Sequence, residues 1–445
     1  MVIVGGGLSG LAAGVGIAAR GIPVVVLEQR AAPGGRALSF TDEHTGEVID
    51  NGQHVLIAGY HRTLRFLETI GTLPLLAVQH HPTLILHHPQ RGFCTFRLPD
   101  LPSPLHLAGG IAATRLFAVR DKLRMLRAGA ALASFRDASP GKAAGMTVDE
   151  WLDAAGQSAE TKRSFWEPLA VSIMNEHCTA ASALVFIRSL RAAFLGGRRS
   201  AALALPTVGL TDLYVHGAVA AIARAGGEVR CGNDVAASSQ NGDAIAGVRL
   251  RDGTTIDCSA LILAVPPARA AQIVPERLRA AGFLAAMAAA PSSPIVSVHL
   301  WYDQDFMPHE FAGVIGRRVQ WVFNRRKIAR APGRGGHVSA VISAAHDAVA
   351  MTNEELTHTA AEDLTAVYGA AAASPVRSVV IREKRATFAC TPAVERMRPG
   401  PLTPVRNLFL AGDWTATGLP ATIEGAIISG ERCVDLAAAC VAASR

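Results

Sequence analysis

The chain opens with a short apolar run, Val2-Ile3-Val4, that leads directly into three glycines. The next stretch, GLSGLAAGVGIAARG, is small and apolar, and PVVVLEQ then repeats the short β-branched pattern. Short continuous apolar runs are typical of strands that are buried on both faces of a parallel sheet. The pattern therefore predicts a strand, a tight turn, a helix and a second strand at the start of the chain.

Two later regions continue the same α/β pattern. One predicts a helix that ends at Gly226-Gly227, several short strands and the buried strand ALILAV, and NLFLAGDWTATGLPATIEGAIISGERC predicts a strand, a loop and a helix. The intervening segments differ, because one is rich in helical periodicity and the other mixes strands with helices. We expect an α/β fold with one discontinuous dinucleotide-binding domain (residues 1–75, 205–270 and 395–445) and an inserted α+β domain (residues 76–204 and 271–394).

Composition narrows the class of protein. Half of the 445 residues are hydrophobic and 18% are charged, which allows a large core and argues against disorder. The excess of basic residues, 43 − 36 = +7, favours an anionic partner, either a phosphate-bearing cofactor or an anionic membrane surface. With 5% aromatic residues and no recognition module, we expect no nucleic-acid partner.

Cysteine usage and hydropathy indicate the compartment. The seven cysteines are scattered and form no CxxC pair, which favours reduced thiols over disulfides or a zinc site. We expect no leader ahead of the glycine turn and no membrane-spanning helix. The predicted location is therefore the cytoplasm, with peripheral contact at the inner face of the membrane as an added hypothesis.

The first glycine turn has the spacing of a dinucleotide motif. Gly5, Gly7 and Gly10 form GxGxxG between a predicted strand and a predicted helix, where backbone N–H groups and the helix dipole bind a pyrophosphate. Glu28 ends the second strand about 20 residues later, where a carboxylate accepts hydrogen bonds from a ribose and repels a 2′-phosphate. The motif and the carboxylate together predict a dinucleotide site and disfavour NADP.

A second glycine turn helps to choose between FAD and NAD. Gly34, Gly35 and Arg36 follow Glu28 in EQRAAPGGRALSF, and a simple NAD-binding unit does not need this element. The alternative is an ordinary solvated loop. We take FAD as the predicted cofactor.

Four blocks carry a resemblance to a known family. VGGGLSGLAAG, LEQRAAPGGRALS, DNGQHVLIAGY and FLAGDWTATGLPATIEGAIISGERC resemble the flavin-containing amine oxidase and phytoene desaturase superfamily. Within it, GQH, TVDEWL, FWEPLAVSIMNEHCTAASA and GLPATIEGA are similar to the squalene-associated branch, whose members are hydroxysqualene dehydroxylases of bacterial hopanoid synthesis. The resemblance covers essentially the whole chain and implies a glutathione-reductase-like Rossmann domain that binds FAD.

The resemblance also implies residue roles. Asp413 is expected at the ribityl or diphosphate side, Thr422 and Gly425 at a helix terminus facing the flavin pyrimidine, Gly52 against the isoalloxazine, and the Val235 backbone at the adenine. The full set of expected FAD-binding residues is Gly5, Gly7, Leu8, Ser9, Gly10, Glu28, Gln29, Arg30, Gly35, Arg36, Gly52, Gln53, His54, Val235, Gly412, Asp413, Thr422, Ile423 and Gly425.

The branch implies an isoprenoid substrate, hydroxysqualene, whose hydroxyl is replaced by hydride from N5 of reduced FAD with acid-assisted loss of water. The electron donor is not identified by the sequence. His54 is the first candidate for the acid, since its ordinary pKa suits proton donation near neutrality, and the alternative is that it only packs against the flavin. The lesser candidates are Asp50, Glu176, His177 and Glu424.

Two further clusters have a functional and a structural interpretation. His80, His81, His87 and His88 surround one predicted strand, and we expect solvated hairpin ends and no metal. The basic stretch from Arg115 to Arg136 is amphipathic, with Leu116, Phe117, Leu123, Met125 and Leu126 as its apolar surface. It is either a surface helix with one face in the core or a helix that lies on an anionic membrane and admits the isoprenoid.

Three alternatives to a dehydroxylase share these motifs. A carotenoid or terpenoid desaturase has the same fold and uses the flavin in the oxidative direction. An amine oxidase is weaker, since the flavin-flanking aromatic cage of those enzymes cannot be placed in the sequence. A non-catalytic lipid-binding flavoprotein predicts bound flavin without redox turnover.

Overall fold

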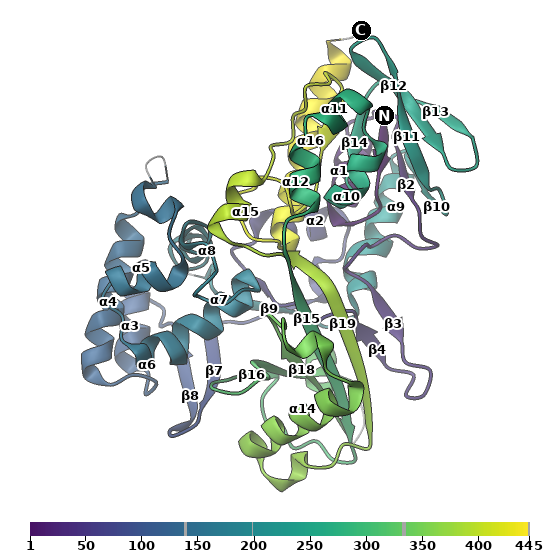
Figure 1. The fold of residues 1–445 in the computed structure, drawn as a ribbon. Coiled ribbons are helices and arrows are strands. Elements are labelled where there is room, and N and C mark those ends of the chain that lie inside the picture. Colours follow the sequence, from purple (N-terminus) through teal and green to yellow (C-terminus); the bar gives the residue numbers. More distant parts are fainter. Residues whose placement is uncertain (138–139, 198, 332–334, 444–445) are drawn as a thin grey trace.

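The computed structural model describes residues 1–137, 140–197, 199–331 and 335–443. A parallel five-stranded sheet lies at the end of the molecule where the two termini meet (Figure 1). Its strand order is β10 (Glu228–Cys231), β2 (Val25–Glu28), β1 (Val2–Val4), β14 (Leu261–Leu263) and β20 (Leu408–Leu410).

Both faces of this sheet are covered. On one face, Ile3 packs in a core cluster with helices α1 (Leu8–Ala18), α9 (Gly217–Arg224) and α16 (Ile423–Ala442). On the other face, Val2 and Val4 pack toward a three-stranded antiparallel sheet. The strands of that sheet are β11 (Val235–Asn241), β12 (Ala244–Leu250) and β13 (Thr255–Asp257). This double burial explains the continuous apolar runs and confirms the predicted α/β class.

Small residues let α1 approach its neighbours closely. A Cβ on Gly430 of α16 would lie 2.3 Å from the carbonyl oxygen of Ser9, and a Cβ on Gly14 would lie 2.9 Å from the Val26 side chain. The alanines and glycines of α1 therefore allow the helix to fit between α16 and the sheet.

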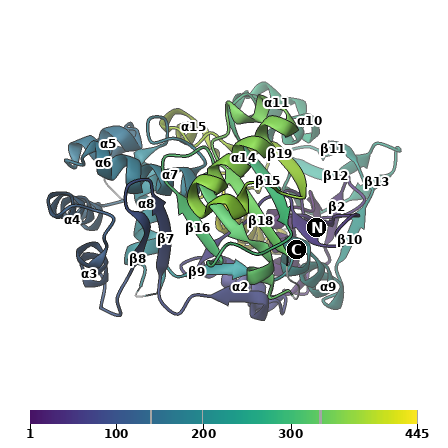
Figure 2. The same ribbon diagram turned by 90° about the horizontal axis from the view of Figure 1, so that it is seen from below.

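A seven-stranded sheet forms the second main layer (Figures 1 and 2). Its order is β19 (Arg377–Phe388), β15 (Ser292–Tyr302), β18 (Gly336–Ile342), β17 (Trp321–Asn324), β16 (Phe311–Val314), β7 (Thr83–His88) and β8 (Gly92–Arg97). Helix α14 (Asn353–Tyr368) begins at a capping box of Thr352 and Glu355 and packs Leu356 and Leu364 into a core with the sheet. The predicted strands PIVSVHLWY and GHVSAVISAA correspond to β15 and β18.

A group of helices lies beside β7 and β8 (Figure 1). The helices are α3 (Leu105–Ala113), α4 (Val119–Ser134), α5 (Val148–Ala154), α6 (Ala159–Thr161), α7 (Glu167–Met174) and α8 (Ala183–Leu195). Helix α5 begins at the predicted capping box: the Thr147 N–H donates to Glu150 at 2.8 Å, and the Glu150 N–H donates to the Thr147 hydroxyl at 3.3 Å.

Short elements join the two layers. They are β3 (Ser39–Thr41), β4 (Val48–Asp50), β5 (Leu56–Ile57), α2 (His61–Thr69), β6 (Leu76–Val78), β9 (Leu203–Pro206), α10 (Pro267–Ile273), α11 (Glu276–Ala280), α12 (Phe283–Ala288), α13 (Arg325–Ala329) and α15 (Pro392–Met397). One small sheet has the order β5-β9-β6 and takes strands from both sides of the expected divisions at 75/76 and 204/205. The domain bounds therefore remain a proposal.

Among the described residues, no helix is long and apolar enough to cross a membrane.

Candidate functional site

The three glycines of the first turn serve different purposes. Gly5 has a φ of +108°, and a Cβ there would lie 2.5 Å from the Ala264 carbonyl oxygen. A Cβ on Gly10 would lie 1.9 Å from the Gly5 carbonyl oxygen. A Cβ on Gly7 would meet no protein atom within 4 Å, and Gly7 lines a large cavity. The fold thus requires glycine at positions 5 and 10, whereas glycine at position 7 leaves room for a ligand against the backbone.

Glu28 closes this turn from the end of β2. Its buried carboxylate accepts hydrogen bonds from the Gly6 N–H at 2.8 Å and the Arg30 N–H at 2.9 Å, one on each oxygen. Each carboxylate oxygen has more than one acceptor site, so Glu28 can still bind hydroxyl groups of a ligand. Glu28 lines the cavity together with Gln29 and Arg30.

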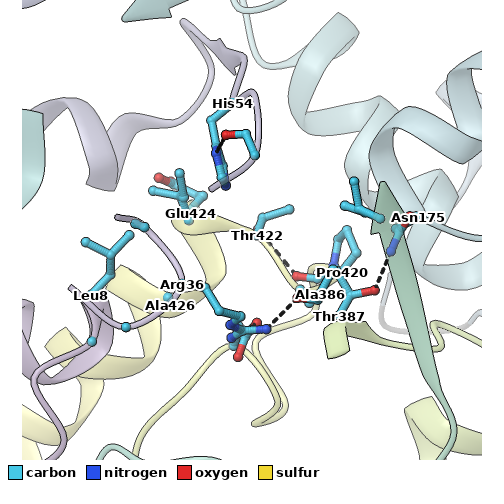
Figure 3. A pocket seen from close by; sticks show the side chains of 18 of the residues that line it. Leu8, Arg36, His54, Asn175, Ala386, Thr387, Pro420, Thr422, Glu424 and Ala426 are labelled. Atoms are coloured by element: carbon cyan, nitrogen blue, oxygen red, sulfur yellow. Dashed lines mark hydrogen bonds and ion pairs between the residues drawn. The ribbon is translucent and has the colours of Figure 1, made fainter. Parts of the chain in front are cut away.

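The second glycine turn packs against the first. Gly35 has a φ of +63°, and its Cβ would lie 3.1 Å from the Gly7 Cα. Arg36 donates to Asp413 at 2.6 Å. It also donates to the Ala386 carbonyl oxygen at 2.6 Å (Figure 3). The negative charge of Asp413 raises the pKa of the Arg36 guanidinium. The pair joins the loop after β2 to the loop after β20.

The first turn of α16 also borders the cavity. Thr422 caps the helix, because its hydroxyl accepts the Gly425 N–H at 3.1 Å. Thr422 and Ile423 line the cavity, so the positive end of a 20-residue helix faces this space. Glu424 caps α2 by accepting the Thr63 N–H at 2.8 Å, and this contact fixes the two helices together.

Arg398 organises the loop between β20 and α16, although no motif in the sequence points to this residue. Its side chain is buried and donates to the carbonyl oxygens of Asp413 at 3.0 Å and Leu419 at 2.7 Å, and also to that of Thr415. The guanidinium lies 4.7 Å from the centre of the Phe388 ring. One cation thus satisfies several carbonyls of a loop that has no regular secondary structure.

The cavity is larger than a single ligand pocket. Its volume of about 1440 Å³ exceeds the roughly 300–1,000 Å³ that is usual for a small-molecule site. One part is lined by the glycine turns and the start of α16, and Figure 3 shows these segments around a common space. The other part is apolar, with the lining residues Leu84, Phe96, Leu98, Leu169, Ile173, Leu203, Ile295, Phe311, Trp321, Phe323 and Val341.

Most of the predicted cofactor residues meet here. All of them line the cavity except Gly10, which is required by the turn itself, and Gly425, whose N–H is bound by Thr422. The carbonyl oxygen of Val235 accepts a hydrogen bond from Arg269 at 2.7 Å, so this backbone atom is already engaged by the protein.

His54 lines the cavity, but its environment does not favour the charged form. Its Nδ1 atom lies 2.7 Å from the Gly52 carbonyl oxygen, so the neutral ring carries its proton on Nδ1 and leaves Nε2 as an acceptor. Burial lowers the pKa of His54 below its ordinary value of 6.5. The acid role of His54 therefore remains a prediction that requires protonation at Nε2.

The other acid candidates are engaged elsewhere. Asp50 forms a buried ion pair with Arg325 at 3.1 Å, and Arg325 also donates to Gln53 at 2.6 Å. Glu176 and His177 are not among the residues that line the cavity. His177 lies 2.6 Å from Glu167, which raises the pKa of this imidazole.

The four histidines around β7 differ from expectation in one respect. His88 was expected at a solvated hairpin end, but it is 3% exposed and bonds to Glu160 at 3.0 Å. The burial follows from the packing of β7 against the helices, which pattern alone does not define. In the described parts of the chain, no cluster of three metal-binding side chains occurs.

Comparisons with known proteins show the family of this chain. The sequence profile of the flavin containing amine oxidoreductase family matches residues 8–438. The chain is 33% identical to the hydroxysqualene dehydroxylase of Rhodopseudomonas palustris, over 98% of this chain and 97% of the relative. It is 31% identical to the hydroxysqualene dehydroxylase of Sinorhizobium fredii, again over 98% and 97%. The chain belongs to the flavin containing amine oxidoreductases, in the branch of the hydroxysqualene dehydroxylases.

The family fold is found in solved structures as well. A crystal structure of an oxidoreductase from Methanosarcina mazei matches this flavoenzyme with a TM-score of 0.74 at 17% identity, covering 98% of this chain and 99% of the other. The predicted FAD-dependent oxidoreductase class is thereby confirmed.

The residues of this flavoenzyme fit FAD. Because Gly7 has no Cβ, a ligand can approach its backbone closely. Glu28 offers hydrogen-bond acceptor sites beside this turn. The start of α16 provides a positive helix end at the same cavity. We propose that these three features hold the pyrophosphate, the ribose and the flavin ring, respectively.

Proposed function

We propose that this flavoenzyme reductively removes the hydroxyl group of hydroxysqualene and releases squalene and water. The observation that carries the proposal is near full-length similarity to curated hydroxysqualene dehydroxylases at 33% and 31% identity. The apolar part of the cavity supports it, because a long hydrocarbon needs an extended apolar wall beside the cofactor site.

The reaction breaks one C–O bond and forms one C–H bond. Bound reduced FAD supplies the two electrons as a hydride to carbon. A proton from an acid joins the departing hydroxide to form water, which balances the reaction. The protein must therefore bind the alcohol, supply that proton and keep bulk water away from the reacting carbon.

Aromatic walls suit an allylic carbon that becomes positive as its C–O bond breaks. Phe96, Phe311, Trp321 and Phe323 line the apolar part of the cavity, and Phe311 and Phe323 are stacked with ring centres 6.3 Å apart. The negative faces of aromatic rings attract a nearby positive charge, most strongly in a desolvated site. We propose that these rings stabilise the developing cation.

Tyr60 is our candidate for binding the substrate hydroxyl. It lines the cavity, and its hydroxyl makes no hydrogen bond to another described residue. Burial, with the nearby charge of Glu424, raises the pKa of the Tyr60 phenol, so the group keeps its proton and can donate a hydrogen bond. Together with the Nε2 acceptor of His54, it offers the alcohol one donor and one acceptor.

An anaerobic experiment tests the proposal. The purified protein is reduced photochemically, hydroxysqualene is added in detergent, and the flavin spectrum and the products are followed. We expect reoxidation without oxygen and the appearance of squalene, with no turnover by a Gly7→Val variant that lacks flavin. If the flavin stays reduced and oxidised enzyme is instead bleached by a saturated terpenoid, the protein is a desaturase. Bound flavin that reacts in neither direction leaves a lipid-binding flavoprotein.

A further inference from the structure

Helix α4 has two apolar faces. Met125, Ala128 and Leu132 are buried in the core. Val119 and Leu123 are 78% and 61% exposed, and Leu126 is 40% exposed. These three exposed residues follow the spacing i, i+4, i+7, which places them on one stripe of a helix. The structure divides the apolar residues of this stretch between the two alternatives: Leu116, Phe117 and Met125 are buried in the core, whereas Leu123 and Leu126 are exposed.

The start of α3 adds to this surface. Leu105 is 59% exposed and Leu101 is 41% exposed, and α3 packs directly against α4. Twelve large apolar side chains are exposed in the part of the chain that the structure describes, and five of them fall within residues 101–126. We call residues 101–127 the α3–α4 surface. Such a concentration of exposed apolar groups marks an interaction site.

The charge of the α3–α4 surface has one sign. It carries five basic residues and one acidic residue, a net charge of 5 − 1 = +4. The acidic residue, Asp121, pairs with Arg124 at 3.1 Å and accepts from Ser158 at 2.8 Å. Arg115, Arg120 and Arg127 are exposed. An apolar stripe flanked by arginines is the pattern of a helix that lies in the interface of an anionic bilayer.

The α3–α4 surface also lies close to the apolar part of the cavity. A Cβ on Gly110 of α3 would lie 2.9 Å from the Leu98 side chain and 3.6 Å from the Phe96 ring, and both of these residues line the cavity. One layer of side chains thus separates α3 from the cavity. Figures 1 and 2 show α3 and α4 at the edge of the molecule remote from the two termini.

We propose that the α3–α4 surface docks on an anionic lipid bilayer, with Val119, Leu123 and Leu126 in the acyl boundary and the arginines at the headgroups. The docking follows from exposure and charge alone. Its purpose, the transfer of an isoprenoid from the bilayer to the cavity, rests on the proposed function.

Flotation of the holoenzyme with vesicles tests the docking. We expect binding to vesicles of equimolar phosphatidylcholine and phosphatidylglycerol, weaker binding to phosphatidylcholine alone, and release by high salt. The double variant Val119→Glu, Leu123→Glu should lower the partition coefficient roughly tenfold or more. Val376→Glu is the matched control, because Val376 is 61% exposed but lies outside this surface.

The outcomes are distinct. No binding by the wild type, or equal loss in the double variant and the control, overturns the proposal. A wild-type dimer that becomes monomeric in the double variant, without vesicle binding, also overturns it and assigns the surface to a second copy of the chain. Turnover in detergent separates docking from chemistry. The double variant should turn over the alcohol in detergent as fast as the wild type does. If the wild type itself shows no turnover in detergent, this result counts against the proposed function only.

Discussion

The guanidinium of Arg36 and the carboxylate of Asp413 lie 2.6 Å apart and connect segments that are 377 residues apart in the sequence. Arg36 follows the second glycine turn and Asp413 follows the last strand of the parallel sheet. Asp413 is therefore engaged by a cation of the protein itself, which the resemblance did not anticipate. The pair fixes the distance between the two sides of the cofactor site.

Replacement of glycines in the first turn should separate cofactor binding from folding. Gly7→Val should leave the protein folded but without FAD, since its side chain enters open cavity space. Gly10→Ala should destabilise the fold by about 3 kcal/mol, because its Cβ overlaps the Gly5 carbonyl oxygen. Flavin content and denaturant unfolding of both variants measure these effects. Full flavin retention by folded Gly7→Val protein contradicts the assignment.

Loss of Arg398 should loosen the loop before α16. Arg398→Ala leaves the Asp413 and Leu419 carbonyls and the Glu395 carboxylate without their buried partner, at a cost of about 3–5 kcal/mol. Thermal unfolding and the rate of FAD release measure the effect. Arg396→Ala is the control, because Arg396 is exposed in α15, two residues before Arg398. Equal effects of the two substitutions argue against a positioning role for Arg398.

The pH dependence of turnover tests His54. Burial lowers its pKa, so the protonated form predominates only at pH values below the ordinary 6.5. If His54 is the acid, kcat/KM should fall as the pH rises through this lowered pKa, and His54→Gln should remove that limb while FAD stays bound. An unchanged profile in the variant assigns the proton to another group.

The same lowered pKa predicts that His54 weakens the fold as the pH falls below 6.5, since protonation then favours the unfolded chain.

Tyr60→Phe should raise KM for the alcohol and lower kcat/KM about tenfold, the effect of one lost hydrogen bond of roughly 1.4 kcal/mol. FAD content should not change. Tyr214→Phe is the matched control: its hydroxyl is buried without a hydrogen-bond partner among the described residues, and it does not line the cavity. Steady-state kinetics in detergent measure both variants. Equal kinetics in Tyr60→Phe and the wild type remove Tyr60 from substrate binding.

Local pattern was enough to predict part of the fold and the cofactor site. The apolar runs around Ile3 and Ile262 predicted strands of one parallel sheet, because burial on both faces leaves no polar alternation. The turn with Gly5 and Gly10 was predictable because backbone overlap excludes any other residue there. These features depend on neighbours in sequence or on a strict steric limit.

Features that depend on tertiary packing were not predictable. Nothing in the spacing of Asp50 and Arg325, which are 275 residues apart, indicates their buried ion pair. Arg398 belongs to no recognisable sequence motif. Its partners are mostly backbone carbonyl groups, and every residue carries one, so their sequence does not reveal the contact. The two interpretations of α4 stayed open at the sequence level because both of its faces are apolar, and the pattern does not say which face meets the core.

The position of β20 in the sheet has a consequence for how the protein acquires FAD. This strand begins at Leu408 and pairs with β14, and the loop and helix behind it supply Asp413 and Thr422 to the cavity. During synthesis, the residues from Gly5 to Glu28 leave the ribosome first, yet the cavity-lining residues that follow β20 are made last. We therefore expect FAD capture to require the finished chain and a nascent or C-terminally truncated chain to remain an apoprotein.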